Sequence, residues 1–272
     1  MTTVAEHRIP RGIVDEETAR TKFTLTRYPS ALPEYVEYHW ILRWDLGEDT
    51  HEQRVLPNLS VTAAFFPDAA GVFGPAHDVF AYRLRGRVQG LGVRFRPGCF
   101  RPFLGAPVTT IADRSVPLTE VFGPDAALTA ETVRSAHSDE EMVDAVDKLL
   151  SANPRPVPEA SRRATDVVET IAADPGITRV DQLCAITGLS IRSAQRLFAE
   201  HVGCTPKWAI RIYRLNDAAR LITQGTTPDY AGLAVRLGYS DQSHFIRDFV
   251  AVTGQSPGEF ARSAHRDRTY RT

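Results

Sequence analysis

Residues 238–257, GYSDQSHFIRDFVAVTGQSP, repeat a pattern that occurs about fifty residues earlier as GLSIRSAQRLFAEHVGCTP. Both stretches begin with Gly and close with Gly-x-Ser/Thr-Pro, and the later copy holds one extra residue near its start. Between these ends, Arg196 aligns with Arg247 and Phe198 with Phe249. A unit that recurs in this way indicates one scaffold used twice for related tasks.

Each copy has the sequence outline of a helix-turn-helix. A short helical pattern is followed by a turn at Gly188 or Gly238 and then by a second helix, for which we expect a Ser cap. Helical hairpins are common in helix-rich proteins, so the outline alone is weak evidence. Together with the flanking patterns it predicts seven helices in the C-terminal part of the chain.

The second helix of each copy is amphipathic. Phe198 and Phe249 lie on the apolar side, and the opposite side carries polar groups of the types that recognise base edges, because Arg pairs with guanine and Gln with adenine. A solvated surface is the alternative for any single helix of this kind, and the repetition favours DNA reading. The predicted base-reading residues are Arg192, Gln195 and Arg196 in the first copy and Gln242, Ser243, His244 and Arg247 in the second.

A long helix is predicted between the two copies, from Pro206 to Gln224. At about 1.5 Å per residue it would be about 28 Å long. Reading helices in adjacent major grooves lie about 34 Å apart, so this helix is a credible spacer. Lys207, Arg211 and Arg214 on this helix are the predicted phosphate contacts.

The C-terminal part resembles the DNA-binding domain of the AraC/XylS family of bacterial transcription regulators. The resemblance covers about residues 165–263 and is carried by LCAITGLS, RLF, GCTP, LAVRLGYSDQSHFIRDF and TGQSPGEFAR. It implies two reading helices in successive major grooves of a double-stranded operator. It also implies a transcription regulator with RNA polymerase as a partner. We expect an activator, with repression as the open alternative. Arg192 stands where the family varies widely, so the operator sequence does not follow.

A proline-rich stretch, SANPRPVPEAS at residues 151–161, predicts a linker between two domains. We expect an α+β protein, with a β-rich barrel or sandwich and helices in residues 1–150. An all-α domain of seven helices would follow in residues 162–265. Its two helix-turn-helix units would lie at about 180–201 and 229–252.

The N-terminal part contains short β-like runs, among them VFAYRLRG and LGVRFRP, with apolar residues at alternate positions. VLPNLSVTAAFF and GLGVRFRPGCFRPFLG look like an N-terminal domain type often found ahead of such DNA-binding modules. The resemblance implies sensing of a small-molecule effector or homodimer formation. We expect Trp40, Trp44, Phe65 and Phe66 to line an effector pocket, with plain core packing as the alternative.

Composition limits the remaining classes of function. Hydrophobic residues make up 43% and charged residues 24%, as in soluble globular proteins. No apolar run is long enough for a membrane span, and the first 20 residues have no signal-peptide core, so we expect a cytoplasmic protein. Residues 161–272 hold 15 Lys and Arg against 11 Asp and Glu, which is compatible with a polyanionic partner.

Neither a metal nor a cofactor is expected. The three cysteines have no CxxC spacing, and His39, His51 and His77 are not clustered as in a metal-binding barrel. The glycines of GRVQGLG lack the spacing of a phosphate-binding loop. Two rival functions stay open: an enzyme whose N-terminal half is catalytic, and a regulator whose helical half binds a protein.

Overall fold

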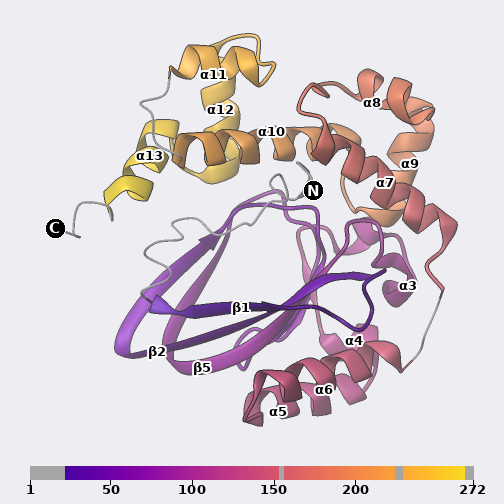
Figure 1. Cartoon of the computed structure of the whole chain (residues 1–272), viewed down its shortest axis with the longest axis vertical. Helices are drawn as coiled ribbons and strands as arrows, with labels where there is room; N and C mark the ends of the chain where they lie inside the picture. Colours follow the sequence, from indigo (N-terminus) through magenta and orange to yellow (C-terminus); the bar gives the residue numbers. More distant parts are fainter. Residues whose placement is uncertain (1–21, 153–155, 224–228, 267–272) are drawn as a thin grey trace.

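The computed structural model describes residues 22–152, 156–223 and 229–266, with side chains up to residue 262. A sheet with flanking helices comes first in the chain, and a region made of helices follows (Figure 1). This confirms the expected α+β class with a β-rich first part and a helical second part. Within the described residues, no helix is both long and apolar enough to cross a membrane.

The first part is built on one antiparallel sheet, with strands in the order β1-β2-β5-β3-β4-β6. Its central pair, β2 and β5, is much longer than the other strands. The strands are β1 (Thr24–Tyr28), β2 (Val36–Val55), β3 (Thr62–Phe65), β4 (Gly71–Phe73), β5 (Phe80–Phe95) and β6 (Ser115–Val116).

The long pair is bent back on itself. Val55 pairs with Phe80, and Thr62 pairs with Arg94. A straight strand from Phe80 to Arg94 would span about 46 Å, whereas the β2–β3 loop, residues 56–61, can reach at most about 25 Å. The ribbon of β2 and β5 must therefore curve so that its two ends approach each other, as Figure 1 shows.

The bend falls where the ladder is irregular. The pairing shifts between Asp45 and Thr50, and Gly47 and Gly86 adopt φ of 56° and 61°. Such positive φ values are accessible to glycine at little cost. The two β-like runs VFAYRLRG and LGVRFRP are consequently parts of one strand, because Gly86 bends the strand without ending it.

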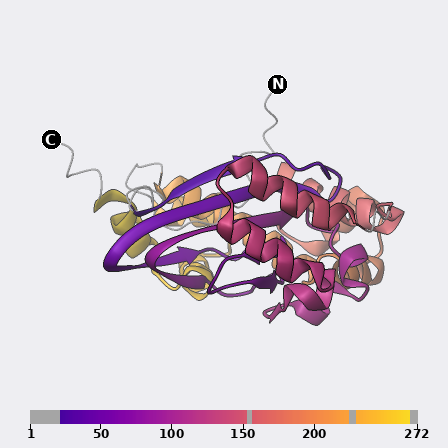
Figure 2. The same ribbon diagram turned by 90° about the horizontal axis from the view of Figure 1, so that it is seen from below.

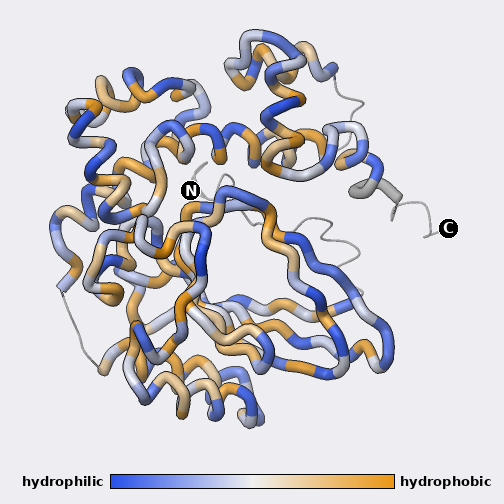
Figure 3. The backbone as a smooth tube through the Cα atoms, turned by 180° about the vertical axis from the view of Figure 1, so that it is seen from behind, coloured by the Kyte–Doolittle hydropathy of each residue, from blue (hydrophilic) through white to orange (hydrophobic). Residues whose placement is uncertain are grey.

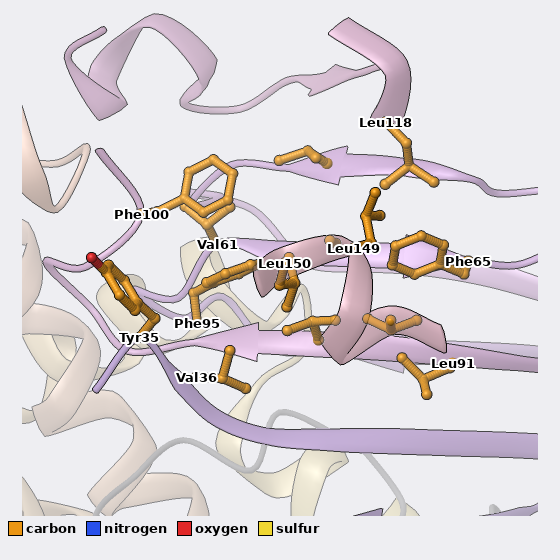
Figure 4. Packing of buried hydrophobic residues seen from close by; sticks show 14 of the residues in the cluster. Tyr35, Val36, Val61, Phe65, Leu91, Phe95, Phe100, Leu118, Leu149 and Leu150 are labelled. Atoms are coloured by element: carbon orange, nitrogen blue, oxygen red, sulfur yellow. The ribbon is translucent and has the colours of Figure 1, made fainter. Parts of the chain in front are cut away.

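One face of the sheet is covered by helices. Leu91, Val93 and Phe95, the alternating residues of the sequence pattern, are fully buried there. Figure 4 shows Phe65 of β3 next to Leu149 of the covering helix, in a core that also contains Leu91 and Leu150. Figure 2 shows the last two helices of this part side by side. The helices of this part are α3 (Arg101–Leu104), the 3-10 helix η1 (Val108–Ile111), α4 (Leu118–Phe122), α5 (Asp125–Ser135) and α6 (Asp139–Ser151).

A buried carboxylate ties α6 to the sheet. One oxygen of Asp147 accepts a hydrogen bond from Ser30 Oγ at 2.6 Å and lies 2.7 Å from Nε2 of the buried His39. The other oxygen accepts from the backbone N–H of Ala31 at 2.8 Å. Burial by itself raises the pKa of Asp147, but the hydrogen bonds from His39, Ser30 and Ala31 outweigh it and hold the pKa below its ordinary value.

We expect Asp147 to make the stability of the protein sensitive to acid. Because the pKa is lower in the folded than in the unfolded state, its contribution is complete above the unfolded value and is lost as the pH falls through the folded value. Asp147→Asn should lower the free energy of unfolding by about 1 to 3 kcal/mol at pH 7 and flatten its pH dependence. Urea unfolding from pH 7 to about pH 3 measures both effects. Asp144→Asn, an exposed position on the same helix, is the control, and equal slopes for wild type and Asp147→Asn would contradict the expectation.

The helical part contains, in its described residues, the seven helices that the sequence predicts. In Figure 3 polar and apolar stretches alternate along them, as expected for helices with one buried side. Val157, inside the predicted linker, is buried with the core of the first part. The end of the predicted spacer helix, Gln224, lies outside the described residues. The helices are α7 (Glu159–Ala173), α8 (Val180–Thr187), α9 (Ile191–His201), α10 (Pro206–Thr223), α11 (Tyr230–Arg236), α12 (Gln242–Thr253) and α13 (Pro257–Arg266).

Candidate nucleic-acid interface and cavity

The first repeated unit is formed by α8 and α9. α8 ends at Gly188, whose φ of 68° makes the turn, and Ser190 caps α9 by accepting a hydrogen bond from the N–H of Ser193. Phe198 is fully buried on the inner side of α9. The turn, the cap and the inward aromatic side chain therefore agree with the sequence prediction for this copy.

The second unit, α11 and α12, uses a different cap. Gly238 has φ of 72° and makes the corresponding turn, but Asp241 caps α12 by accepting from the N–H of His244 at 2.8 Å. The expected Ser cap is wrong for this copy. Ser240 instead hydrogen-bonds to Asp241 and to the ring of His244. The extra residue of the later copy is thus the one that caps the helix, since Asp is as good an N-cap as Ser.

The predicted base-reading side chains lie on the outer sides of α9 and α12. All seven are exposed, and the inner sides of the same helices are anchored by the fully buried Phe198, Phe245 and Phe249. Except for His244, none of the seven side chains has a hydrogen-bond or ion-pair partner within the described part of the chain. Two rigid helices therefore present free donors and acceptors to solvent.

The predicted phosphate contacts on α10 divide into two kinds. Lys207 is exposed at the start of the helix. Arg211 lies over the Trp208 ring and forms a 3.1 Å ion pair with Asp248. Arg214 lies 4.0 Å from the centre of the Tyr239 ring, and its Nε donates to the Leu237 carbonyl. Both arginines thus join α10 to the second unit, which leaves Lys207 as the accessible candidate.

Two family models match different parts of the chain. Residues 183–263 match the model described as a helix-turn-helix domain. The helical part contains an AraC-type helix-turn-helix domain. Residues 28–117 match a second model, described as Domain of unknown function (DUF6597). The AraC-type domain lies in the helical part, and the DUF6597 domain lies in the β-rich part.

Relatives of the AraC-type domain are named as regulators. The RCS-specific HTH-type transcriptional activator RclR of Escherichia coli (strain K12) is 32% identical over 95 residues, which are 35% of this chain and 33% of that protein. An uncharacterised HTH-type transcriptional regulator of Haemophilus influenzae (strain ATCC 51907 / DSM 11121 / KW20 / Rd) is 29% identical over 84 residues, 31% of this chain and 28% of that protein. The similarity thus spans about a third of the length of these two regulators.

Most of the chain also aligns with solved structures of ToxT from Vibrio cholerae. One of them, ToxT from strain O395 bound to (E)-4-(8-methylnaphthalen-1-yl)but-3-enoic acid, has 11% sequence identity and a TM-score of 0.39. The alignment covers 89% of this chain and 99% of that chain.

A cavity of about 480 Å³ lies in the bend of the sheet, within the DUF6597 part. One limb of the bent ribbon contributes Trp40 and the other contributes Phe80 and Tyr82. Trp40 stacks on Phe66 with ring centres 5.4 Å apart, and Phe80 stacks on Tyr82 at 6.4 Å. The size of the cavity falls in the range that holds small organic ligands.

The four predicted pocket residues lie in different positions relative to the cavity. Trp40 and Phe66 line the cavity. Trp44 packs beside it, stacked on Phe66 with ring centres 6.1 Å apart. Phe65 lies on the opposite face of the sheet, in the core beneath α5 and α6. Neighbouring residues of a strand point to opposite faces, so Phe65 and Phe66 could not both line one cavity.

Two glycines that the sequence left without a role make room for this cavity wall. A Cβ on Gly92 would lie 2.1 Å from the Trp40 ring, and one on Gly90 would lie 2.3 Å from the Phe66 ring. The two rings can therefore rest directly on the backbone of β5. The alternating glycines of QGLG were the signal that could have located the wall, because a strand-interior glycine marks a close approach.

The cysteines and histidines of the described residues do not assemble into a reactive group. All three cysteines are buried, and burial raises the pKa of the Cys204 thiol to about 12. His39 is bound to Asp147, as described above, and His201 lies 3.1 Å from the Ser161 hydroxyl in the helical part. Among the described residues, no group of three or more His, Cys, Asp or Glu side chains could hold a metal ion.

Proposed function

We propose that this protein is a sequence-specific DNA-binding transcription regulator, in which α9 and α12 enter two successive major grooves. The observation that carries the proposal is the repeated helix with a buried aromatic anchor on one side and exposed Arg and Gln side chains on the other. Arg192, Gln195 and Arg196 would read one groove, and Gln242, Ser243, His244 and Arg247 the other.

The spacer between the two units supports this arrangement. α10 has 18 residues, which corresponds to about 27 Å. Arg211 and Arg214, near the middle of α10, join the helix to the second unit through Asp248, Tyr239 and the Leu237 carbonyl. Lys207, in the first turn of α10, would contact a phosphate without adding sequence preference.

The proposal assigns a task to each part of the chain. Residues 1–150 would sense a small-molecule effector or form a homodimer, 151–161 would link, and 162–265 would bind the operator and contact RNA polymerase. The effector would occupy the cavity beside Trp40 and Phe66. In this proposal the protein acts in the cytoplasm as an activator and carries no catalytic residue.

Binding to DNA should depend steeply on salt. Each phosphate neutralised by a basic side chain adds about 0.9 to the slope of log affinity against log salt. We expect the Kd of the full chain for duplexes selected from a random library to rise at least about tenfold between 50 and 200 mM salt. Fluorescence anisotropy measures this. If the full chain retains no duplex from the library, or if the Kd does not change with salt concentration, DNA binding is contradicted and a protein partner is favoured.

A further inference from the structure

The cavity is joined to both DNA-reading units by one loop. The β2–β3 loop supplies Leu56, Pro57, Asn58 and Ser60 to the cavity lining. Leu56 is also buried in the core of the second unit, a cluster that we call the second-unit core. Leu59 is buried in the corresponding first-unit core. The second-unit core includes Ile212, Leu233, Phe245 and Phe249, and the first-unit core includes Val168, Leu183, Phe198 and Ile210.

Leu59 and Leu56 fill positions that the helices leave open. Leu59 is 2% exposed and Leu56 is 8% exposed, although the loop that carries them belongs to the β-rich part. Packed cores respond to small displacements because their interiors are nearly as dense as crystals. A change in the path of this loop must therefore alter the packing of both reading units.

Two further contacts join the cavity rim to the helices. Val79, at the cavity, packs against the second-unit core. Asp113, also at the cavity, binds the N–H and the ring of His77, and this ring lies 4.6 Å from that of Trp208 on α10. In addition, Arg54 at the end of β2 donates to the carbonyl of Thr253, the last residue of α12.

The cavity lining indicates the kind of ligand. Its aromatic side chains, from Trp40, Phe66, Phe73, Phe80 and Tyr82, favour a flat ring system that can stack. Among the residues that line it, all of which lie in the described part of the chain, Arg114 is the single cation, and it is exposed at the rim. An anionic group inside the cavity would have no buried cation to pair with, which is costly.

We propose that the cavity binds a flat, uncharged aromatic molecule, and that the β2–β3 loop transmits its binding to both reading units through Leu56 and Leu59. The transmission to the reading units rests on the proposed function, because it is measured as a change in DNA affinity. The ligand need not move the helices far, because the loop already lies in both cores.

Ligand class is tested with a pair of dyes on the full chain. N-phenyl-1-naphthylamine is uncharged, and 8-anilinonaphthalene-1-sulfonate has the same ring skeleton with an added anion. We expect saturable fluorescence enhancement for the uncharged dye and at least about tenfold weaker binding of the sulfonate. Equal or tighter binding of the sulfonate, or absence of saturable binding of the uncharged dye, would overturn the ligand class.

Two substitutions place the dye in the cavity. Gly92→Ala should displace the Trp40 ring into the cavity and weaken binding of the uncharged dye, because the new Cβ overlaps that ring. Phe80→Ala removes a stacking wall that is 44% exposed and should also weaken it. Leu128→Ala, which removes a 70% exposed side chain from α5, is the matched control and should leave dye binding unchanged. Equal dye affinities for wild type, Gly92→Ala and Phe80→Ala would place the dye elsewhere and overturn the site.

Transmission from the cavity to the reading units is tested by measuring the Kd of the full chain for a selected duplex, with and without a saturating concentration of the uncharged dye. We expect the Kd for DNA to change at least about fivefold in the wild type. In Leu59→Ala this change should shrink toward none while the dye still binds, since Leu59 is in the first-unit core and does not line the cavity. If thermal melting shows that alanine unfolds the helical part, Leu59→Val is the milder truncation.

The outcomes separate the two proposals. Dye binding in the cavity with a DNA Kd that stays constant within twofold would overturn transmission by the loop and leave the DNA-binding proposal standing. A full chain that binds the dye but no duplex would contradict the proposed function, and the ligand class would still be decided by the two dyes. An equal dye effect on DNA binding in wild type and Leu59→Ala would also overturn the role of the loop.

Discussion

Replacing Arg196 and Arg247 together by alanine is expected to weaken binding to a selected operator by about 2 to 6 kcal/mol. Each arginine is exposed on a different reading helix, and one lost bidentate base contact costs about 1 to 3 kcal/mol. The two effects should be nearly additive because the residues lie on separate units and have no common partner. Anisotropy titrations of the two single variants and the double variant measure the three losses.

The same titrations need a control for the loss of positive charge. Arg134 pairs with Glu131 on α5. This helix lies on the side of the molecule away from the helical part (Figure 1). Arg134→Ala should leave the Kd unchanged within about twofold. Duplexes newly selected by the Arg196→Ala variant should show a relaxed base preference in only one half of the site. Variants that fold and bind the operator as tightly as wild type would exclude these two helices as the readers.

Phe245→Ala is expected to lower the stability of the second unit by about 3 to 5 kcal/mol. The ring is fully buried and packs against Tyr239, with ring centres 5.5 Å apart, and Phe249, at 5.7 Å. Its removal would leave a cavity between α10, α11 and α12. Because domains of this kind are only marginally stable, DNA binding by α12 should be lost at the temperature where the unit melts.

A matched substitution on the same helix tests that interpretation. Val250 is 39% exposed, and Val250→Ala should change the free energy of unfolding by no more than about 0.5 kcal/mol. Denaturant unfolding monitored by circular dichroism gives both values. Equal losses for Phe245→Ala and Val250→Ala would show that the buried ring does not anchor the reading helix.

The helices α9 and α12 could be predicted from the sequence because the residues that define them are close together in the chain. With 3.6 residues per turn, Phe198 and Arg196, two residues apart, lie on opposite sides of the helix. A Gly turn with a following cap fixes where each helix starts. The cap of α12 was predictable in principle, since Asp241 is an excellent N-cap and is the residue by which the two copies differ in length.

Other features depended on contacts between distant residues. Arg211 and Arg214 lie at helical positions that suit phosphate contacts, but their engagement by Asp248 and Tyr239 follows from how α11 and α12 pack on α10. The sequence around Leu56 and Leu59 also has no periodic pattern that would predict their insertion into two helical cores. A short loop between strands carries no pattern that tells which distant core its side chains enter.

The extra Asp241 determines how the two units can be exchanged by protein engineering. In the first unit the cap follows Gly188 by two residues, and in the second it follows Gly238 by three. Reading positions counted from the turn are thus out of step by one residue, or about 100° of helix rotation. A graft of Arg192, Gln195 and Arg196 onto α12 must be aligned from the cap, at positions 243, 246 and 247. The same graft aligned from the glycine would replace Phe245 by Gln and place a polar group in the core of the recipient.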